Sequence, residues 1–547
     1  MESQKSFLLI GLAFVSYLLW EQWQLDQMPP PAPVTEQVQQ AAKVKAVASA
    51  NAVSSGEMPV SSNAIATTEE VVSTSSIWVK TDVIEAQINL LGGDVTTVKL
   101  LNYPKEKDGE EAFEVLSESG KDLFHAQSGL VGVNGPDANP KGRPLYTAKA
   151  DSYILAGDSL VVPLSFVTED GLVITKTFTF SQGQYDVKID FNVQNQSDSV
   201  KNVQLFSQFK QTVFETQGSM MMPTYHGAAY STHNETYEKI DFDDIFDGNL
   251  KENSNGGWIA MIEHYFVAAF IPAATDQIEI STRALSGRQA LITYKNEAVN
   301  IAPNSSQVLT TRLYAGPKDQ DALAKLAEHL DLTVDYGFLW FISQPLFALL
   351  IFLQGIVTNW GVAIILITII VKGAMYPLTK KQYTSMAKLR KLQPKLTELK
   401  NRCGDDKQKF SQAMMELYRK EKVNPMGGCL PLLIQMPIFL ALYWVFVESV
   451  ELRHAEFALW IHDLSQLDPY YVLPILMGVS MFVMQKLQPT PMQDPVQQKI
   501  FQYMPVMFTF FFLWFPAGLV LYWLVSNIIS IIQMLYINKS IEKQGLK

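Results

Sequence analysis

Short segments in which apolar and polar residues alternate fill the chain from residue 77 to about residue 333. Alternation with a period of two predicts strands that bury one face. Glycine, asparagine and aspartate separate the segments at intervals, as turns between strands require. We therefore expect an antiparallel β-sandwich domain over residues 76–335, closed by a short helix over residues 319–329. The clearest alternating segments are residues 83–90, 172–180 and 187–193.

Long apolar runs replace this alternation in the last third of the chain. Such runs predict membrane-spanning helices, although several are short or contain proline, which is tolerated where neighbouring helices cover the backbone. The runs are residues 360–376, 430–447, 471–484, 503–515 and 518–537. Together with an apolar run at residues 7–20, they predict a polytopic α-helical membrane protein with six spans, five of them in a core bundle over residues 356–547.

The first apolar run, residues 7–20, has two interpretations. A cleaved signal peptide has an apolar core of this length. However, the run ends in Trp-Glu-Gln-Trp at residues 20–23, with no small residues at the spacing of a cleavage site, which favours an uncleaved signal anchor over residues 1–24. Residues 25–75 are rich in Pro, Gln, Ala, Val, Ser and Thr and predict a flexible linker.

Residues 336–355 lie between the predicted sandwich and the first span of the predicted bundle. They are apolar and aromatic on one side and more interrupted than the later runs. We expect them to be too interrupted to span and to form an amphipathic helix in the outer interface of the membrane.

The charge of the chain is divided between its two halves. The net charge is −11, but residues 1–335 carry −19 and residues 336–547 carry +8. The segment 380–422 holds 13 Lys and Arg against 5 acids, and the segment 448–468 holds one Arg against 5 acids. The positive-inside rule then places the first segment and both termini in the cytoplasm, and the sandwich on the outer side of the membrane.

Composition excludes other classes of protein. The net negative charge argues against a general nucleic-acid binder, including a DNA-binding protein. The two cysteines, Cys403 and Cys429, are too few for a disulfide scaffold or a multi-cysteine zinc site. We expect no metal, cofactor or catalytic constellation, since the histidines of the sandwich are scattered singly.

Lys372 is the strongest candidate for a functional residue. It lies about 12 Å from the basic edge at Lys380 if the segment is helical. A lysine inside a membrane costs on the order of 2.5–3.5 kcal/mol, and none of the five runs after residue 355 contains Asp or Glu to pair with it. Either its stem reaches towards the cytoplasmic headgroups, or it lines a water-filled groove open to the cytoplasm.

Other polar residues in the apolar runs fit such a groove. Each of them alone fits equally well a role in joining helices by hydrogen bonds. Together with an unpaired lysine they favour a water-filled groove. The set is Thr368, Gln435, Ser526, Asn527, Ser530 and Gln533.

Residues 380–422 predict a cytoplasmic helical hairpin. Leucines at three- and four-residue spacing form an apolar side in its first half, and Met414 belongs to the apolar side of its second half. Asp405 or Asp406, after a glycine, can cap the second helix. The basic outer surface either only fixes the topology or meets anionic lipid headgroups or ribosomal RNA.

Four motifs resemble the YidC/Oxa/Alb family of membrane protein insertases. They are Gly-Ala-Met-Tyr-Pro-Leu-Thr at 373–379, Asn-Pro-Met-Gly-Gly-Cys at 424–429, Leu-Ile-Gln-Met-Pro-Ile-Phe at 433–439 and Leu-Trp-Phe-Pro-Ala-Gly-Leu at 513–519. The anchor, the large periplasmic sandwich and the five further spans resemble the Gram-negative form of this family, so the resemblance covers nearly the whole chain.

The resemblance implies a non-enzymatic insertase and chaperone of the bacterial inner membrane. Its implied partners are nascent inner-membrane proteins, the Sec translocon with its accessory subunits, the ribosome or the signal recognition particle receptor, and membrane lipids. The family commonly has arginine where this chain has Lys372. The resemblance also implies an apolar wall, part helical core and part client contact, made of Phe439, Met477, Phe511 and Trp523, with Trp523 standing where a tyrosine is usual.

Two other functions are considered beside the insertase. A small-solute transporter would have paired intramembrane charges or two similar halves with broken helices, and the sequence contains neither. A periplasmic carbohydrate-binding module on an anchor rests on the sandwich fold alone.

Overall fold

The computed structural model describes residues 76–118, 123–140, 142–213, 224–404, 406–421, 430–487 and 495–543. The predicted anchor and linker, residues 1–75, lie outside the described residues. Among these residues the chain divides into two compact units, one within Ser385–Gly428 and the other within Ser54–Thr384 and Cys429–Gly545. Each unit is described by itself below.

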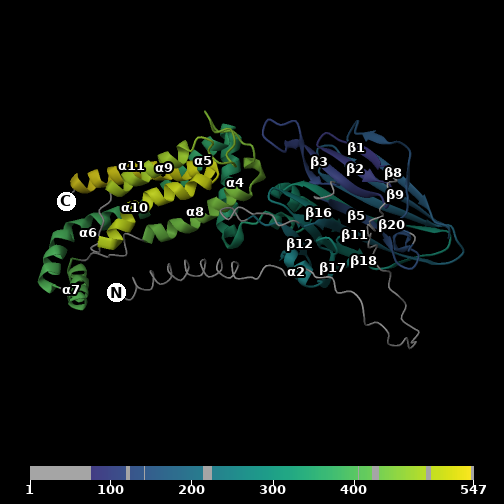
Figure 1. The fold of residues 1–547 in the computed structure, drawn as a ribbon, viewed down its shortest axis with the longest axis horizontal. Coiled ribbons are helices and arrows are strands. Elements are labelled where there is room, and N and C mark those ends of the chain that lie inside the picture. Colours follow the sequence, from purple (N-terminus) through teal and green to yellow (C-terminus); the bar gives the residue numbers. More distant parts are fainter. Residues whose placement is uncertain are drawn as a thin grey trace, which may run out of the picture. The chain divides into compact units, whose positions relative to one another are not determined.

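The β-rich part of the larger unit consists of two large sheets (Figure 1). In the first, eleven strands include the path β14-β17-β18-β11-β5-β3-β2-β1-β7, with β19 paired to β11 and β4 paired to β3. Their bounds are β1 Ser76–Lys80, β2 Ile84–Asn89, β3 Asp94–Pro104, β4 Ala112–Leu116, β5 Phe124–Val131, β7 Ser152–Ile154, β11 Lys201–Thr212, β14 Lys251–Asn255, β17 Gln277–Leu285, β18 Gln289–Asn296 and β19 Val299–Ile301.

The second sheet has nine strands in the order β13-β12-β15-β16-β20-β10-β9-β8-β6. The strands are β6 Thr147–Ala148, β8 Ser159–Val167, β9 Leu172–Ser181, β10 Asp186–Asn195, β12 Gly227–Ser231, β13 Glu238–Ile240, β15 Trp258–Ile262, β16 Phe266–Pro272 and β20 Ser305–Pro317. All pairs in the two sheets are antiparallel except β1 with β7. The predicted antiparallel sandwich is therefore confirmed, with one parallel pair at an edge.

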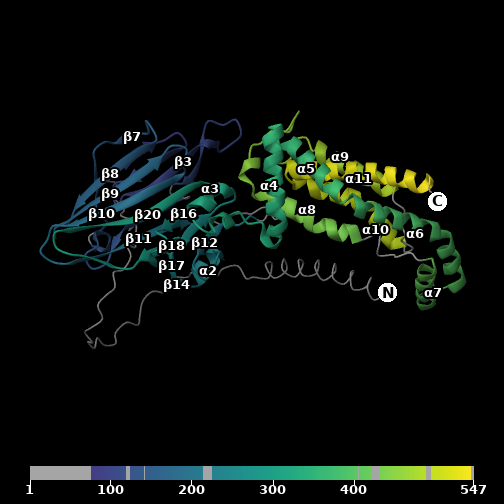
Figure 2. The ribbon, with the colours of Figure 1, turned by 180° about the vertical axis from the view of Figure 1, so that it is seen from behind.

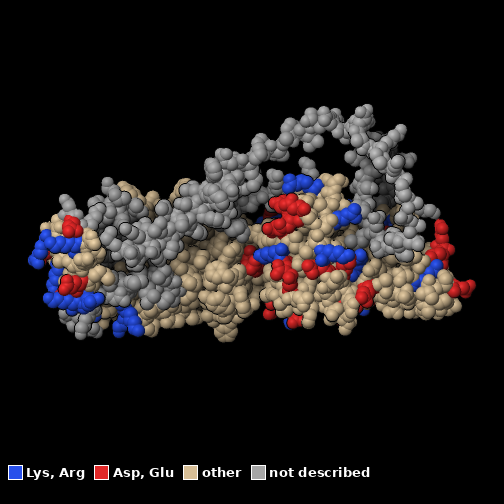
Figure 3. All heavy atoms as spheres, turned by 90° about the horizontal axis from the view of Figure 1, so that it is seen from below, with Lys and Arg blue, Asp and Glu red and all other residues tan. Residues whose placement is uncertain are grey.

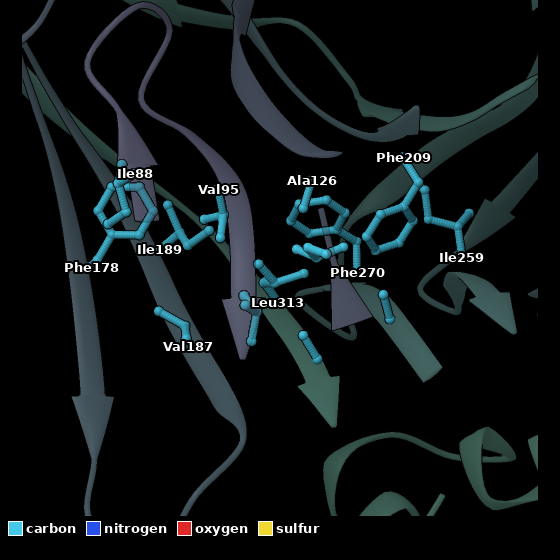
Figure 4. Close-up of a cluster of buried hydrophobic side chains, with 14 of the residues drawn as sticks. Ile88, Val95, Ala126, Phe178, Val187, Ile189, Phe209, Ile259, Phe270 and Leu313 are labelled. Atoms are coloured by element: carbon cyan, nitrogen blue, oxygen red, sulfur yellow. The ribbon is translucent and has the colours of Figure 1, made fainter. Parts of the chain in front are cut away.

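Side chains from both sheets meet in one apolar core (Figure 4). Alternate residues of β9 are buried along its whole length, as the period of two predicts. Phe209 of β11 and Phe270 of β16 lie 4.8 Å apart between ring centroids, which joins the first sheet to the second. The turn before β3 uses Gly92 and Gly93 at φ +79° and +64°, a conformation that favours glycine.

Short helices accompany the sandwich. They are η1 Pro136–Ala138, α2 Phe242–Asp247, α3 Gln320–Leu326 and η2 Leu330–Thr333. The side chain of Asp319 caps α3 by accepting a hydrogen bond from the Ala322 N–H at 3.0 Å. The helix predicted for residues 319–329 is thus present, but α3 ends at Leu326, followed by the separate turn η2.

Helices form the rest of the larger unit (Figure 2). In chain order they are η3 Gly337–Leu339, α4 Trp340–Val357, α5 Trp360–Ala374, the start of α6 Tyr376–Cys403, α8 Leu430–Glu448, η5 Val450–Leu452, α9 Val472–Leu487, α10 Pro495–Phe511, η6 Phe512–Trp514 and α11 Ala517–Lys543. A second apolar cluster holds α4, α5, α8, α9 and α11 together. Gly478 lets α9 approach α10 closely, because a Cβ there would lie 1.8 Å from Thr509 Oγ1.

Two described helices are long and apolar enough to cross a membrane, Gly337–Val357 and Ala517–Ile541. The pair Trp360–Ala374 and Tyr376–Leu389, bent by 62°, adds a third if it forms one span. Gln435–Glu448 and Val472–Leu487 are apolar but shorter. The count of six spans therefore stays a prediction.

The segment expected to be an interfacial helix is more regular than the sequence suggested. The helix α4 continues through Pro345, and with η3 it reaches the length of a span. Its interruption by proline removes one backbone hydrogen bond, which neighbouring helices can compensate. The segment is therefore long and apolar enough to span, and its placement in the outer interface of the membrane stays a prediction.

The smaller unit contains the predicted helical hairpin. The later part of α6 is followed by a turn at Gly404, with φ +57°, and by α7 Lys407–Lys420. Lys395 Nζ of α6 donates to Glu421 Oε1, just after α7, at 2.6 Å, which brings the end of α7 back beside the middle of α6. Over this hairpin, at the left of Figure 3, Lys and Arg predominate with a few Asp and Glu among them, and both signs also mix over the β domain.

Candidate functional site

Lys372 lies near the end of α5 and is only 6% exposed. Its Nζ donates a hydrogen bond to Ser530 Oγ of α11 at 2.9 Å. Among the described residues, no carboxylate lies within 4.0 Å of this ammonium, and Ser530 is its one hydrogen-bond partner. An ammonium has three donors. Two of them therefore remain available in this part of the structure.

The face of α11 towards α5 presents polar groups one turn apart. Ser530 Oγ donates to the carbonyl of Ser526 at 2.8 Å, so the acceptor of Lys372 is itself oriented. Gln533 Nε2 donates to the backbone carbonyl of Lys372 at 3.2 Å, and Gln533 Oε1 is buried with no partner among the described residues. Spacings of three and four residues place these groups on one side of the helix.

Gln435 of α8 approaches the same side of α11. Its Nε2 lies 3.5 Å from Ser526 Oγ, at the long limit of a hydrogen bond. The structure thus brings together Lys372, Gln435, Ser526 and Gln533 from three helices.

Two predicted groove residues have other partners. Thr368 is fully buried, and its hydroxyl donates to the Ile364 carbonyl one turn earlier in α5 at 2.6 Å. Asn527 Nδ2 donates to Ser480 Oγ of α9 at 3.0 Å. These contacts correspond to the alternative of hydrogen bonds within and between helices.

The predicted apolar wall is divided in the same way. Trp523 lies at the centre of an aromatic cluster, 4.4 Å from the ring of Phe439 on α8 and 4.8 Å from the ring of Phe512. Met477 of α9 is fully buried in the core, whereas Phe511 of α10 is 39% exposed. A segment sliding past the helices would contact residues such as Phe511 and not Met477.

In the hairpin, Asp406 is the residue that caps α7. Its Oδ1 accepts from the N–H groups of Gln408 at 3.1 Å and Lys409 at 3.0 Å. Asp405 lies outside the described residues. Met414 is partly buried on α7.

Other kinds of site are sparse. No cluster of three or more potential metal ligands occurs among the residues that the structure describes. A polar pocket of about 550 Å³ lies in the sandwich, lined by residues of β14, β17 and β18 among others, and not at Lys372.

Sequence analysis did not identify Lys176 or the contacts of Lys318. Lys176 occupies an inward position of the alternating strand β9, between Ile174 and Phe178. A lysine among the apolar, inward-facing residues of an alternating strand is the feature by which the sequence could have identified Lys176. Lys318 gave no signal, because its partner is 130 residues away in the sequence.

Two family models match the chain. One, described as "60Kd inner membrane protein", matches residues 352–544, and the other, described as "YidC periplasmic domain", matches residues 76–349. Together they cover most of the described residues.

Curated relatives match over the full length. The chain is 54% identical over 549 residues to the membrane protein insertase YidC of Pseudoalteromonas atlantica and 51% identical over 552 residues to that of Shewanella frigidimarina, with 100% of each chain covered. A solved structure described as "Active YidC insertase crystal structure with the first transmembrane domain resolved" matches 84% of this chain and 92% of its own, at 20% identity and a TM-score of 0.37.

Proposed function

Because the chain belongs to the YidC family of membrane protein insertases, we propose that it inserts membrane proteins at a polar site around Lys372. The activity is that of an insertase and not of an enzyme. Family membership also favours this function over a small-solute transporter or an anchored carbohydrate-binding module. The periplasmic β domain and apolar helices belong to a membrane-inserted protein.

The availability of Lys372 supports the proposal. Its charge is buried, its one partner among the described residues is a neutral hydroxyl, and two of its donors remain available. A carboxylate or polar segment of a client that reaches this point gains a partner that the surrounding helices do not supply. This contact lowers the free-energy barrier for moving the polar end of the client into the membrane. The apolar segment of the client meanwhile moves along the exposed apolar side of the helices.

The finer parts of the proposal extend this mechanism to the whole chain. The protein crosses the inner membrane six times with both termini in the cytoplasm, and the groove opens to the cytoplasm. Client binding includes Lys372, Gln435, Ser526 and Gln533, with Phe439, Phe511 and Trp523 along the apolar path. The hairpin receives clients. The partners of the protein are the Sec translocon, the ribosome or the signal recognition particle receptor, and membrane lipids.

Thiol labelling tests access to the site. Lys372→Cys, in a background without Cys403 and Cys429, should react with a membrane-impermeant thiol reagent from the cytoplasmic side. Ile369→Cys, one turn earlier at a residue 50% exposed on the apolar surface, is the matched control and should stay protected. Equal protection of both sites contradicts a water-filled groove.

Insertion assays test the role of the charge. Lys372→Ala should impair clients with acidic tails more than clients with neutral tails, and Lys372→Arg should retain function. Lys486→Ala, which changes an exposed lysine of α9, is the control. Equal loss for acidic and neutral clients contradicts the carboxylate-binding role of Lys372.

A further inference from the structure

The end of α8 packs against the β-sandwich through a buried ion pair. Lys318, directly after β20, donates from Nζ to Glu448 Oε2 at 2.7 Å, and the two side chains are only 2% and 5% exposed. Glu448 is the last residue of α8. Two buried charges hold each other in place because each is strongly unfavourable without the other.

A second contact lies one residue earlier. The ring of His264, in the turn between β15 and β16, bonds through Nε2 to the Val447 carbonyl at 2.8 Å. Burial lowers the pKa of His264 to about 4, so the ring is neutral and Nε2 donates. The last carbonyls of a helix have no partner within the helix, so this bond stabilises the end of α8.

The turn η5 continues the contact into the core of the sandwich. Val450 is 3% exposed and belongs to the apolar cluster of the β domain. Arg453 Nη2 donates to the carbonyls of Pro104 at 2.8 Å and Lys105 at 3.0 Å. Its guanidinium also lies 5.5 Å from the centre of each of the Phe113 and Phe266 rings.

A further contact joins the loop between β3 and β4 to the segment after α8. Lys107 donates to Glu456 Oε1 at 2.9 Å and also to the His462 carbonyl. The end of α8 and the segment after it are therefore bound to strands β3, β4, β16 and β20 by hydrogen bonds, charge and apolar packing together.

We propose that these contacts form a clamp through which the β domain positions α8 at the client site. We define the clamp as Lys318, Glu448, His264, Val450 and Arg453. The inference rests on the proposed function for its effect on insertion.

The helix α8 carries the effect of the clamp to the site. Glu448 is 13 residues from Gln435, or about 20 Å along a helix. At that other end, α8 meets the polar face of α11 through the long 3.5 Å contact between Gln435 and Ser526. This contact is weak, and the apolar cluster of the bundle packs the helix between Ile438 and Phe446. The clamp adds a fixed point at the end of α8 beside the β domain. Lys318 and Glu448 are therefore positioning residues.

The test measures both the position of α8 and insertion in the full-length protein in membranes. Cysteines introduced by Gln435→Cys and Ser526→Cys, without Cys403 and Cys429, report the position by the rate at which they form a disulfide. Insertion is measured separately, with the native residues at 435 and 526. The disulfide rate needs no client, so it stays informative if the proposed function fails.

Lys318→Met leaves Glu448 buried without a partner. We expect it to slow disulfide formation and to lower insertion by at least about tenfold, because a lone buried charge is strongly unfavourable. Lys318→Met combined with Glu448→Leu leaves no buried charge at this contact. This double variant should restore most of the disulfide rate and most of the insertion activity. Lys201→Met breaks a different 2.7 Å ion pair of the sandwich, that of Lys201 with Asp170, and is the control that should change neither the disulfide rate nor insertion.

Two results overturn the clamp. One is a Lys318→Met protein that forms the disulfide and inserts clients like the Lys201→Met protein. The other is a loss of insertion with an unchanged disulfide rate, which leaves the insertase function intact but removes the positioning role. Arg453→Met, at the edge of the clamp, replaces Lys318→Met if that variant does not accumulate, and its results are interpreted in the same way.

Discussion

The β-sandwich and the helical bundle each bury a lysine, and they treat it differently. Lys176 of β9 is fully buried and donates to three backbone carbonyls, those of Gly92 at 3.1 Å, Gly93 at 2.8 Å and Ser128 at 2.8 Å. Lys372 of α5 is nearly as buried but has one hydroxyl partner among the described residues.

The surroundings extend this difference. Near Lys176, Arg143 pairs with Asp137 at 2.8 Å and also with Asp94, so the buried cluster combines two basic and two acidic groups, and burial lowers the pKa of Lys176 to about 7. Near Lys372 the other polar groups are neutral amides and hydroxyls. A satisfied charge holds a fold together, whereas an unsatisfied one can still bind a further partner.

The largest expected effect is the loss of Lys176. Lys176→Met leaves three carbonyls without their donor and removes one of the two basic groups of the cluster, so we expect a destabilisation of about 3–5 kcal/mol. Thermal unfolding of the full chain in detergent measures it. Lys188→Met, at a largely exposed site on the next strand, should have almost no effect. Equal effects of the two substitutions contradict a structural role for Lys176.

Lys372→Met should give the opposite result. Removing a buried charge that lacks a carboxylate partner should leave thermal stability unchanged or raise it, while insertion of a client with an acidic tail falls by about tenfold, or about 1.4 kcal/mol. Unfolding and insertion are measured on the same preparation. A large loss of stability would make Lys372 structural, like Lys176, and remove the contrast between the two regions.

Glu263 of the sandwich differs from the acids that pair with Arg143, because no cation lies within 4.0 Å of it among the described residues. Burial raises its pKa from 4.5 to about 7. The folded protein therefore keeps a proton that the unfolded chain loses, and stability falls as the pH rises from about 4.5 through 7. Glu263→Gln should be neutral at pH 4.5 and stabilising by on the order of 1 kcal/mol at pH 8.

Unfolding curves at several pH values measure this difference. Glu279→Gln is the matched control, since the pKa of Glu279 is lowered, with Lys251 and Lys295 bonded to it. A Glu263→Gln protein whose stability relative to the native chain does not change with pH would show that Glu263 is ionised in the fold.

The smallest effect is expected at an exposed charge of the hairpin. Asp406→Ala removes the cap of α7 and should cost about 1 kcal/mol of local helix stability. Hydrogen exchange at the first amides of α7, including Gln408 and Lys409, measures it, with Asp406→Asn as a variant that keeps a capping acceptor. Unchanged exchange in Asp406→Ala would show that the cap does not stabilise the helix.

Local patterns in the sequence determined the elements and the main candidate residue. The period of two in β9 and β10 predicted strands that pair along their whole length, because that period depends only on the geometry of a strand. Lys372 stood out because a charge in an apolar run is unfavourable wherever the helix packs. The cap by Asp406 was likewise predictable, since it involves residues two and three positions away.

Only the tertiary structure decided which polar groups meet. Thr368, Asn527 and Ser530 are equivalent candidates by sequence, but Thr368 bonds within its own helix, Asn527 turns to α9 and Ser530 meets Lys372. Their partners depend on helix rotation, which the packing of the whole bundle fixes. Lys318 and Glu448 form a pair only because the end of β20 and the end of α8 come together in space, and no spacing in the sequence records that.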